Sequence, residues 1–219
     1  PDLQAATAVQ ESPQFVMAHV LQAWLLLCGR EPTAIRAATP ILARALALPA
    51  NERERLHLAA AAAVADDDYP RARAVLAALS EREPHDVLAL QVGHAFDYLT
   101  GDAARMRDSL SAILGRWSDA LPGYHAVLAM YAFGLEECGD YRRAEDFALR
   151  ALEHNPLDAR AHHALAHVFE MTGRADEGLR WMVANMSLWA HGTTVATHCW
   201  WHLALFQLGQ GRLDLALAL

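Results

Sequence analysis

Histidine is the strongest candidate in this chain for metal binding or catalysis, because it is both abundant and regularly spaced. Seven of the 12 histidines lie between His154 and His202. His163 and His167 are four residues apart, and so are His198 and His202. Residues at that spacing lie one above the other on a helix face. Each pair can therefore present two imidazoles to one ion or to one substrate group.

A carboxylate extends the first pair, because Glu170 follows His167 by three residues. Imidazole and carboxylate together suit Zn²⁺, Fe²⁺, Mn²⁺ or Ni²⁺. Without a metal the same groups suit general acid–base catalysis, because histidine titrates near neutral pH. The predicted ligands of a divalent transition metal are His163, His167, His198 and His202. The predicted catalytic groups are His163, His167, Glu170 and His202.

A purely structural role for these residues is the alternative interpretation. A helical histidine is commonly a partly buried side chain that hydrogen-bonds to a backbone carbonyl or a carboxylate. Trp200 and Trp201 point about 100° apart on a helix, so one can pack inside while the other contacts a ligand; we assign the ligand contact to Trp201. Arg107 is a candidate contact for an anionic ligand, and otherwise an ordinary surface arginine.

Composition limits the class of protein. Of the 219 residues 54% are hydrophobic, which excludes a disordered chain, and the net charge of −8 argues against a nucleic-acid partner. The three cysteines, Cys28, Cys138 and Cys199, form neither a disulfide framework nor a CxxC zinc motif. The longest apolar run, residues 58–65, is far too short to cross a membrane. We expect a cytoplasmic protein without a membrane or nucleic-acid partner.

The chain contains an internal repeat. Abundant Ala and Leu and the lack of strand signals predict an all-α protein. Short polar or glycine breaks recur with separations that alternate between 38 and 34 residues, and prolines lie between several of them. The repeat pattern therefore predicts that each unit contains a helix, a tight turn, a second helix and a loop. A kink or break is expected at Pro40. The breaks are Gly29–Glu31, Asp67–Tyr69, Gly101–Ala103, Gly139–Tyr141, Gly173–Ala175 and Gly211–Leu213.

This period and content resemble the tetratricopeptide repeat. The small residues Ala144, Ala148 and Ala151, followed by Pro156, fit its pattern of closely packed helices. The resemblance implies a right-handed superhelical solenoid of about six helix pairs, in a single domain over residues 1–219. The leucines from Leu213 to Leu219 leave an apolar C-terminal end. We therefore expect either a longer natural chain or a homo-oligomer that forms through this end.

A narrower resemblance, to the tetratricopeptide repeat protein 38 family, rests on Met130–Glu137, Ala164–Met171, His198–Leu205 and Met106–Asp108. It implies the helical repeat fold and little about activity. In tetratricopeptide proteins the first helices of the repeats line a concave groove, so the resemblance implies that both histidine pairs lie on neighbouring walls of that groove. Glu136 and Glu137, from the preceding first helix, are expected to reach the same space.

Two functions follow from this arrangement. The favoured one is a groove that binds a peptide segment or a small molecule. Its expected ligand contacts are Trp201, Glu136, Glu137, His198 and Arg107. The alternative is an enzyme whose groove carries a metal-dependent or a His/Glu acid–base active site. Convergent carboxylates and imidazoles favour the enzyme, whereas no sequence motif names a reaction.

Overall fold

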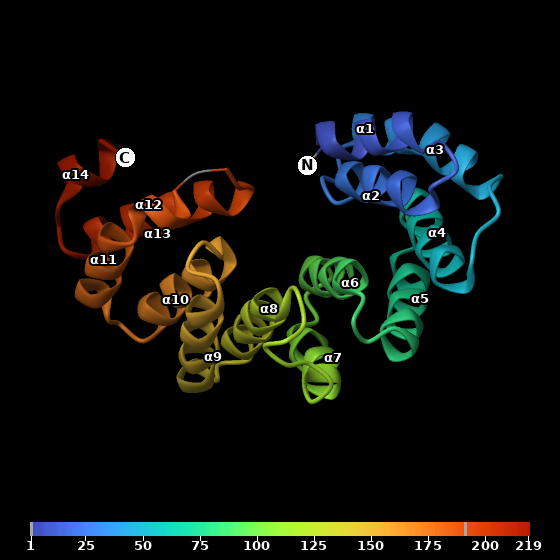
Figure 1. The fold of residues 1–219 in the computed structure, drawn as a ribbon. Coiled ribbons are helices and arrows are strands. Elements are labelled where there is room, and N and C mark those ends of the chain that lie inside the picture. Colours follow the sequence, from blue (N-terminus) through green and yellow to red (C-terminus); the bar gives the residue numbers. More distant parts are fainter. Residues whose placement is uncertain (1, 191) are drawn as a thin grey trace. The chain divides into compact units, whose positions relative to one another are not determined.

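The computed structural model describes residues 2–190 and 192–219, and all the secondary structure in these ranges is helical (Figure 1). The predicted all-α fold class is thereby confirmed. The helices are α1 (Asp2–Glu11), α2 (Val16–Leu27), α3 (Pro32–Leu46), α4 (Glu52–Ala65), α5 (Tyr69–Arg82), α6 (Val87–Leu99), α7 (Ala103–Leu114), α8 (Tyr124–Glu137), α9 (Tyr141–His154), α10 (Ala159–Met171), α11 (Ala175–Ala184), α12 (Met186–Trp189), α13 (Thr194–Gly209) and α14 (Leu213–Leu217).

The six predicted turns are all present between helices. Each contains one residue in the left-handed region of backbone conformation, where a helix commonly ends. At Gly139 (φ 78°) the turn is closed by the N–H of Asp140, which donates to the carbonyl of Leu135 at 2.9 Å. The left-handed residues of the six turns are Arg30, Asp67, Gly101, Gly139, Gly173 and Gly211.

Aspartates at these turns also start the next helix. The side chain of Asp140 accepts a hydrogen bond from the backbone N–H of Arg143, and Asp68 and Asp102 cap α5 and α7 in the same way. A carboxylate at this position satisfies a helix N–H group that has no partner within the helix. A glycine or aspartate followed by an aspartate therefore encodes both the end of one helix and the start of the next.

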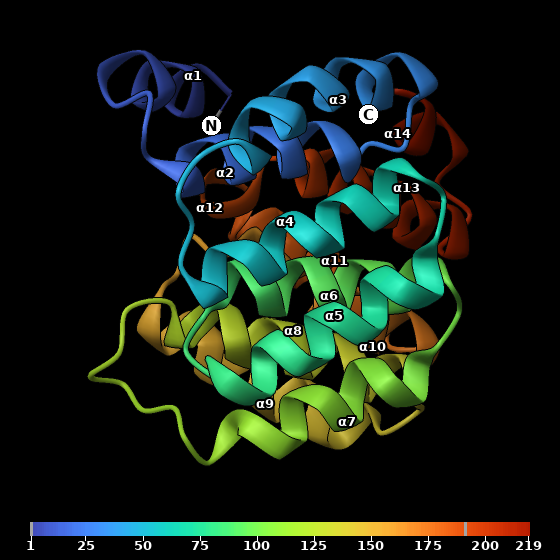
Figure 2. The ribbon, with the colours of Figure 1, turned by 90° about the vertical axis from the view of Figure 1, so that its right-hand side faces the viewer.

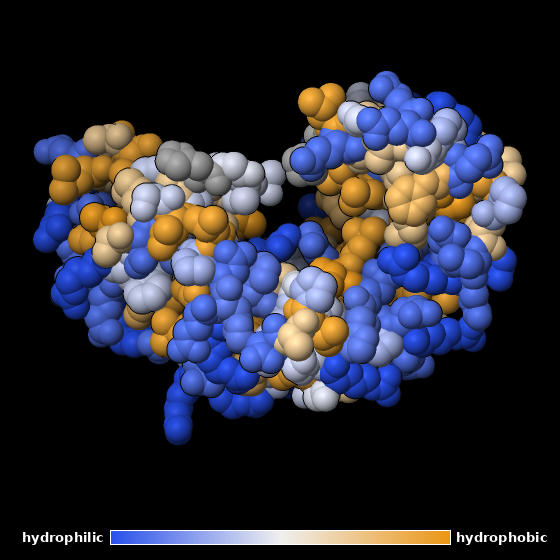
Figure 3. Space-filling view, in the orientation of Figure 1, coloured by the Kyte–Doolittle hydropathy of each residue, from blue (hydrophilic) through white to orange (hydrophobic). Residues whose placement is uncertain are grey.

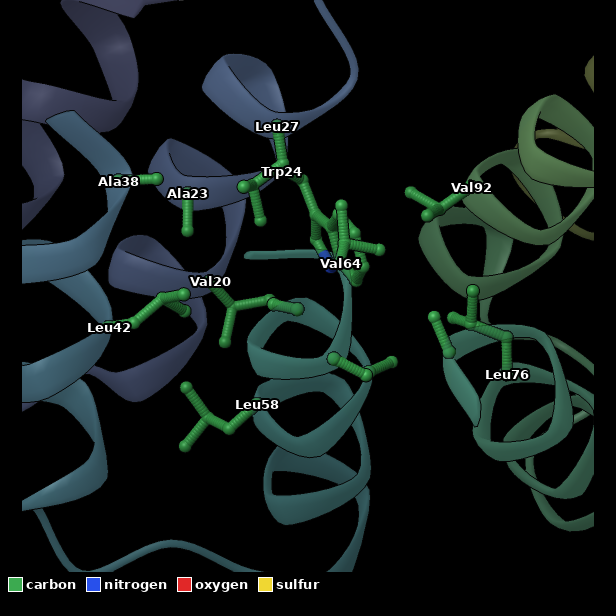
Figure 4. Packing of buried hydrophobic residues seen from close by; sticks show 14 of the residues in the cluster. Val20, Ala23, Trp24, Leu27, Ala38, Leu42, Leu58, Val64, Leu76 and Val92 are labelled. Carbon is green, nitrogen blue, oxygen red and sulfur yellow. The ribbon is translucent and has the colours of Figure 1, made fainter. Parts of the chain in front are cut away.

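The chain divides into two compact units, Pro1–Gly101 and Asp102–Leu219. In the first unit, the core is formed by side chains from successive helices, among them Val20 and Trp24 of α2, Leu42 of α3 and Leu58 of α4 (Figure 4). Helices α4 and α5 lie side by side as one pair (Figure 2). The predicted break at Pro40 is wrong, because α3 continues through this residue.

The second unit contains both histidine pairs. Helix α10 contacts α8, α9, α11 and α13 (Figure 1). The core here includes Phe169, Trp189, Leu203 and Phe206. Trp189 belongs to the short helix α12, is fully buried, and donates a hydrogen bond to the carbonyl of Met182 at 2.9 Å. The segment between α11 and α13 therefore contributes to the core.

The last helix, α14, is strongly apolar on its surface. The leucines that the sequence places at this end are all exposed, and Leu217 is 87% exposed. Figure 3 shows the resulting hydrophobic surface over α14, at the upper left. An oligomer through this end stays a prediction. Within the described residues, no helix has the length and apolar character needed to span a bilayer.

Candidate metal centre

Four imidazoles meet in the second unit. His163 and His167 come from α10, His198 and His202 come from α13, and one ring nitrogen from each lies within 4.8 Å of the others. The six distances between ring centroids run from 4.4 to 5.7 Å. The closest approach is between Nε2 of His163 and Nε2 of His167, at 2.9 Å. The two pairs that are 35 residues apart in sequence therefore form one cluster, which we call the imidazole cluster.

Close packing between helices brings these rings together. Helix α13 is capped by Thr193, whose hydroxyl accepts a hydrogen bond from the backbone N–H of Ala196. It also packs tightly against α11, because a Cβ atom at Gly178 would lie only 2.5 Å from the ring of Phe206. Gly178 thus allows the close approach that fixes α13 in this unit.

Carboxylates contact two of the imidazoles from outside the cluster. Nδ1 of His202 donates to Oε2 of Glu170 at 2.7 Å. Nδ1 of His167 lies 3.5 Å from Oε2 of Glu136, which is an ion-pair distance without a hydrogen bond. Glu136, Glu137 and His167 also bring one ligand atom each to within 4.8 Å of one another. The three predicted glutamates, Glu136, Glu137 and Glu170, therefore all border the histidines.

Burial keeps three of the imidazoles, those of His163, His167 and His202, neutral. Desolvation, reinforced by the neighbouring histidines, lowers the pKa of His167 and of His202 to about 4 and holds the pKa of His163 well below its usual value. The opposite shift occurs at Glu136, where desolvation and the charges of Glu137 and Glu170 raise the pKa to about 7. Neutral imidazole is the form that binds metal ions.

One ring nitrogen in the cluster has no partner among the described residues. Nε2 of His202 is buried and makes no hydrogen bond, although Nδ1 of the same ring is bound to Glu170. With the proton fixed on Nδ1, Nε2 presents a lone pair. A buried polar atom without a partner is costly, and commonly marks the place of a missing ion or water.

The other two predicted ligand contacts, Trp201 and Arg107, are not part of the imidazole cluster. Trp201 is 59% exposed, one residue before His202, whereas Trp200 packs against Trp189 with ring centroids 5.1 Å apart. The prediction that one tryptophan packs inside is confirmed for Trp200. The contact described for the guanidinium of Arg107 is to its own neighbour Asp108, with Nε 2.7 Å from the carboxylate. No described contact links Arg107 to the imidazole cluster.

Sequence reasoning missed Phe133 of α8. Its ring lies 5.2 Å from that of His163 and 5.4 Å from that of His167, measured between centroids. A phenylalanine in an apolar helix carries no signal that distinguishes this position from ordinary core. Cys199, between the two α13 histidines, is fully buried, and desolvation raises its pKa to about 12. Its thiol therefore stays protonated and is a poor ligand or nucleophile.

Another histidine of α10 illustrates the structural alternative. Trp181 Nε1 donates to Nδ1 of His162 at 3.2 Å, and Nε2 of the same ring donates to the carbonyl of Pro156 at 3.0 Å. Both ring nitrogens of His162 are thus satisfied by the protein itself. This buried residue has a structural role, in contrast to His163, the next residue in the sequence.

Fold and site together define an all-α helical repeat protein with a cluster of four histidines. No family model matches the chain, so the resemblance to the tetratricopeptide repeat protein 38 family stays a prediction. Among solved structures the chain is similar to "Crystal Structure of P58(IPK) TPR Domain", at 14% identity and a TM-score of 0.39. The match covers 95% of this chain and 64% of that one, and it carries no information about activity.

Proposed function

We propose that this helical repeat protein binds a divalent transition metal, with His163, His167, His198 and His202 as the ligands. The observation that carries the proposal is the presence of four imidazole nitrogens within 4.8 Å of one another. In a tetrahedral zinc site with bonds of about 2.1 Å, neighbouring ligand nitrogens lie about 3.4 Å apart. Binding of the ion therefore requires the four side chains to adjust their torsion angles.

The protonation state supports this proposal. A cluster of four charged imidazoles would repel a cation, but the pKa values of His163, His167 and His202 are all lowered. In addition, hydrogen bonding from Nδ1 to a carboxylate, as between His202 and Glu170, fixes the tautomer that leaves Nε2 free to bind a metal. Such carboxylate partners are common behind metal-binding histidines and increase their basicity.

Access to the site also supports binding of an exchangeable ion. His198 is exposed, whereas His202 is buried, so the cluster has one side toward solvent. Ions that accept more than four ligands would keep positions open on that side for water or for a small molecule. A metal centre of this kind is compatible with the metal-dependent form of the enzyme hypothesis, whereas the acid–base form requires histidines that are free of metal.

Isothermal titration of Zn²⁺ into the metal-free protein tests the proposal. Wild-type protein is expected to bind Zn²⁺ with all four histidines, and His198→Ala to bind it more than about 100-fold more weakly, because loss of a ligand exceeds the 10–100-fold effect of losing a carboxylate behind one. His154→Ala, which removes an exposed histidine of α9 in the same unit, is the matched control. Equal zinc affinity in His198→Ala and wild type would refute the proposal.

A second candidate is the binding of a peptide segment or a small molecule beside the cluster. The exposed ring of Trp201 favours it, because an aromatic side chain at a helix surface offers apolar contact area to a ligand. On this hypothesis Trp201→Ala weakens capture of the ligand while zinc affinity stays unchanged. A ligand that binds Trp201→Ala and wild type equally would argue against this role.

A further inference from the structure

A second group of potential ligands lies next to the imidazole cluster. Glu136 and Glu137, in the last turn of α8, bring carboxylate oxygens to within 4.8 Å of each other and of a nitrogen of His167. Only 5% of Glu136 is exposed, and its Oε2 atom makes no hydrogen bond to any described residue. A buried carboxylate oxygen without a donor indicates that a partner of positive charge is missing.

The charges around Glu136 lead to the same conclusion. Besides the ring of His167, the ionisable groups that act on it are Glu137 and Glu170, which are both carboxylates. The last turn of α8 contains no basic residue, and the C-terminal end of a helix already disfavours negative charge. A cation between Glu136 and Glu137 would offset the repulsion and give the buried oxygen a partner.

The ring of His167 stands between the two groups. Its Nε2 lies 2.9 Å from Nε2 of His163, in the imidazole cluster, whereas its Nδ1 lies 3.5 Å from Oε2 of Glu136. The two nitrogens of one ring are therefore directed toward two different sets of ligands.

From this arrangement we infer a second divalent cation, held by Glu136, Glu137 and Nδ1 of His167, so that His167 bridges two metal ions. The inference rests on the proposed imidazole site, because His167 belongs to both. Two carboxylates and one imidazole suit Mn²⁺, Fe²⁺ or Zn²⁺. When both ions bind, the ring N–H proton of His167 is released to solvent, and the ring becomes a bridging imidazolate with one lone pair toward each ion.

The bridge sets what this pair of ions can do. In hydrolytic two-metal sites the ions are about 3.5–4 Å apart and share one oxygen. Here a whole imidazole ring separates them, so they cannot hold one attacking oxygen in that way. The second ion instead links α8 to α10 and compensates the charge of the carboxylates.

Counting bound zinc tests the inference. Metal-free wild type, Glu137→Gln, His198→Ala and the control Glu153→Gln, an exposed glutamate of α9, are loaded with Zn²⁺, desalted and analysed for metal, with helix content checked by circular dichroism. Glu137 is the chosen position because it is exposed, unlike Glu136, so that its substitution leaves the buried packing of α8 intact. The expected result is two zinc ions in wild type and Glu153→Gln, and one in Glu137→Gln.

The other outcomes separate this inference from the proposed function. One zinc in wild type that is kept in Glu137→Gln and lost in His198→Ala overturns the second site and leaves the imidazole site standing. One zinc that is lost in Glu137→Gln and kept in His198→Ala overturns the imidazole site instead. Absence of bound zinc in the wild type overturns both.

Discussion

Two buried histidines, His57 of the first unit and His202 of the second, have opposite roles. In the first unit, His57 accepts a hydrogen bond at Nδ1 from Trp24 Nε1 (3.4 Å) and donates one from Nε2 to Asp86 (2.8 Å). In the second unit, His202 donates to Glu170 but leaves its buried Nε2 without a partner among the described residues. Both rings are almost fully buried. Burial of a histidine alone therefore does not indicate a functional site. A buried ring nitrogen that has no hydrogen-bond partner and lies next to other imidazoles does indicate one.

The charge around His57 completes this contrast. Burial acts to raise the pKa of Asp86, but hydrogen bonds from His57 and Arg53 outweigh it and hold the pKa well below its usual value. The carboxylate is thus a stable anion between two donors. Oε2 of Glu136 has no corresponding donor among the described residues, and the pKa of this glutamate is raised.

The largest expected effect is on stability at His57. His57→Ala removes one of the donors to buried Asp86 and the acceptor of Trp24, so the free energy of unfolding should fall by about 3 kcal/mol. Urea unfolding followed by circular dichroism measures it. Zinc affinity should be unchanged. A loss below about 1 kcal/mol would show that His57 is not the structural counterpart of His202.

The next largest effect is on zinc affinity at His202. His202→Ala removes a ligand, so Zn²⁺ should bind more than about 100-fold more weakly. Without metal, the variant should lose only about 1 kcal/mol of stability, because the lost packing is partly offset by removal of a buried nitrogen that has no partner. Titration calorimetry and urea unfolding of the same sample give both values. Unchanged zinc affinity together with a large loss of stability would mean that His202, like His57, has a structural role only.

A smaller effect is expected where α13 packs on α11. Gly178→Ala puts a methyl group against the buried ring of Phe206, which should reduce the free energy of unfolding by about 2 kcal/mol and weaken zinc binding by displacing the α13 histidines. Gly209→Ala is the matched control, because a Cβ atom there meets nothing within 4 Å. Equal melting temperatures for the two variants would contradict the packing argument.

A further effect is the pH dependence of the stability of the metal-free protein, in which two opposing contributions partly cancel. His163, His167 and His202 have folded-state pKa values below the usual 6.5, so the unfolded chain binds more protons as the pH falls from about 6.5 toward 4, and stability decreases. The contribution of Glu136 to the pH dependence of stability has the opposite sign. Its pKa is raised from 4.5 to about 7, so the folded protein binds more protons in that range, and acidification stabilises it.

Glu136→Gln separates these contributions. Without the opposing carboxylate, the loss of stability between pH 6.5 and pH 4.5 should be steeper than in wild type. Urea midpoints measured at pH 7, 5.5 and 4.5 provide the comparison. A shallower loss in Glu136→Gln would mean that the charges in the cluster have been assigned incorrectly.

Much of the architecture could be predicted, because the information is local. A left-handed turn residue followed by an Asp cap specifies where one helix ends and the next begins, and this pattern located the turns before Asp68, Asp102 and Asp140. The i,i+4 spacing likewise identified both histidine pairs. The break predicted as one alternative at Pro40 was wrong, because local sequence does not reveal how far packing against neighbouring helices maintains a helix.

The details of the site depend on contacts that local spacing does not encode. The sequence does not tell that His162 is satisfied by Trp181 and Pro156 while the adjacent His163 joins the cluster. Nor does it tell that Phe133 lies against two of the imidazoles. These facts depend on the rotation of α8 and α11 about their axes, which the packing of the whole unit determines.

X-ray absorption at the zinc edge of the zinc-loaded protein is the most direct test of whether the imidazole cluster binds the metal. We predict a first shell of nitrogen and oxygen at about 2.0–2.1 Å, with the outer-shell scattering of several imidazole rings that diminishes in His198→Ala. A first shell of oxygen alone, without imidazole scattering, would mean that zinc binds elsewhere and would contradict the proposed histidine site.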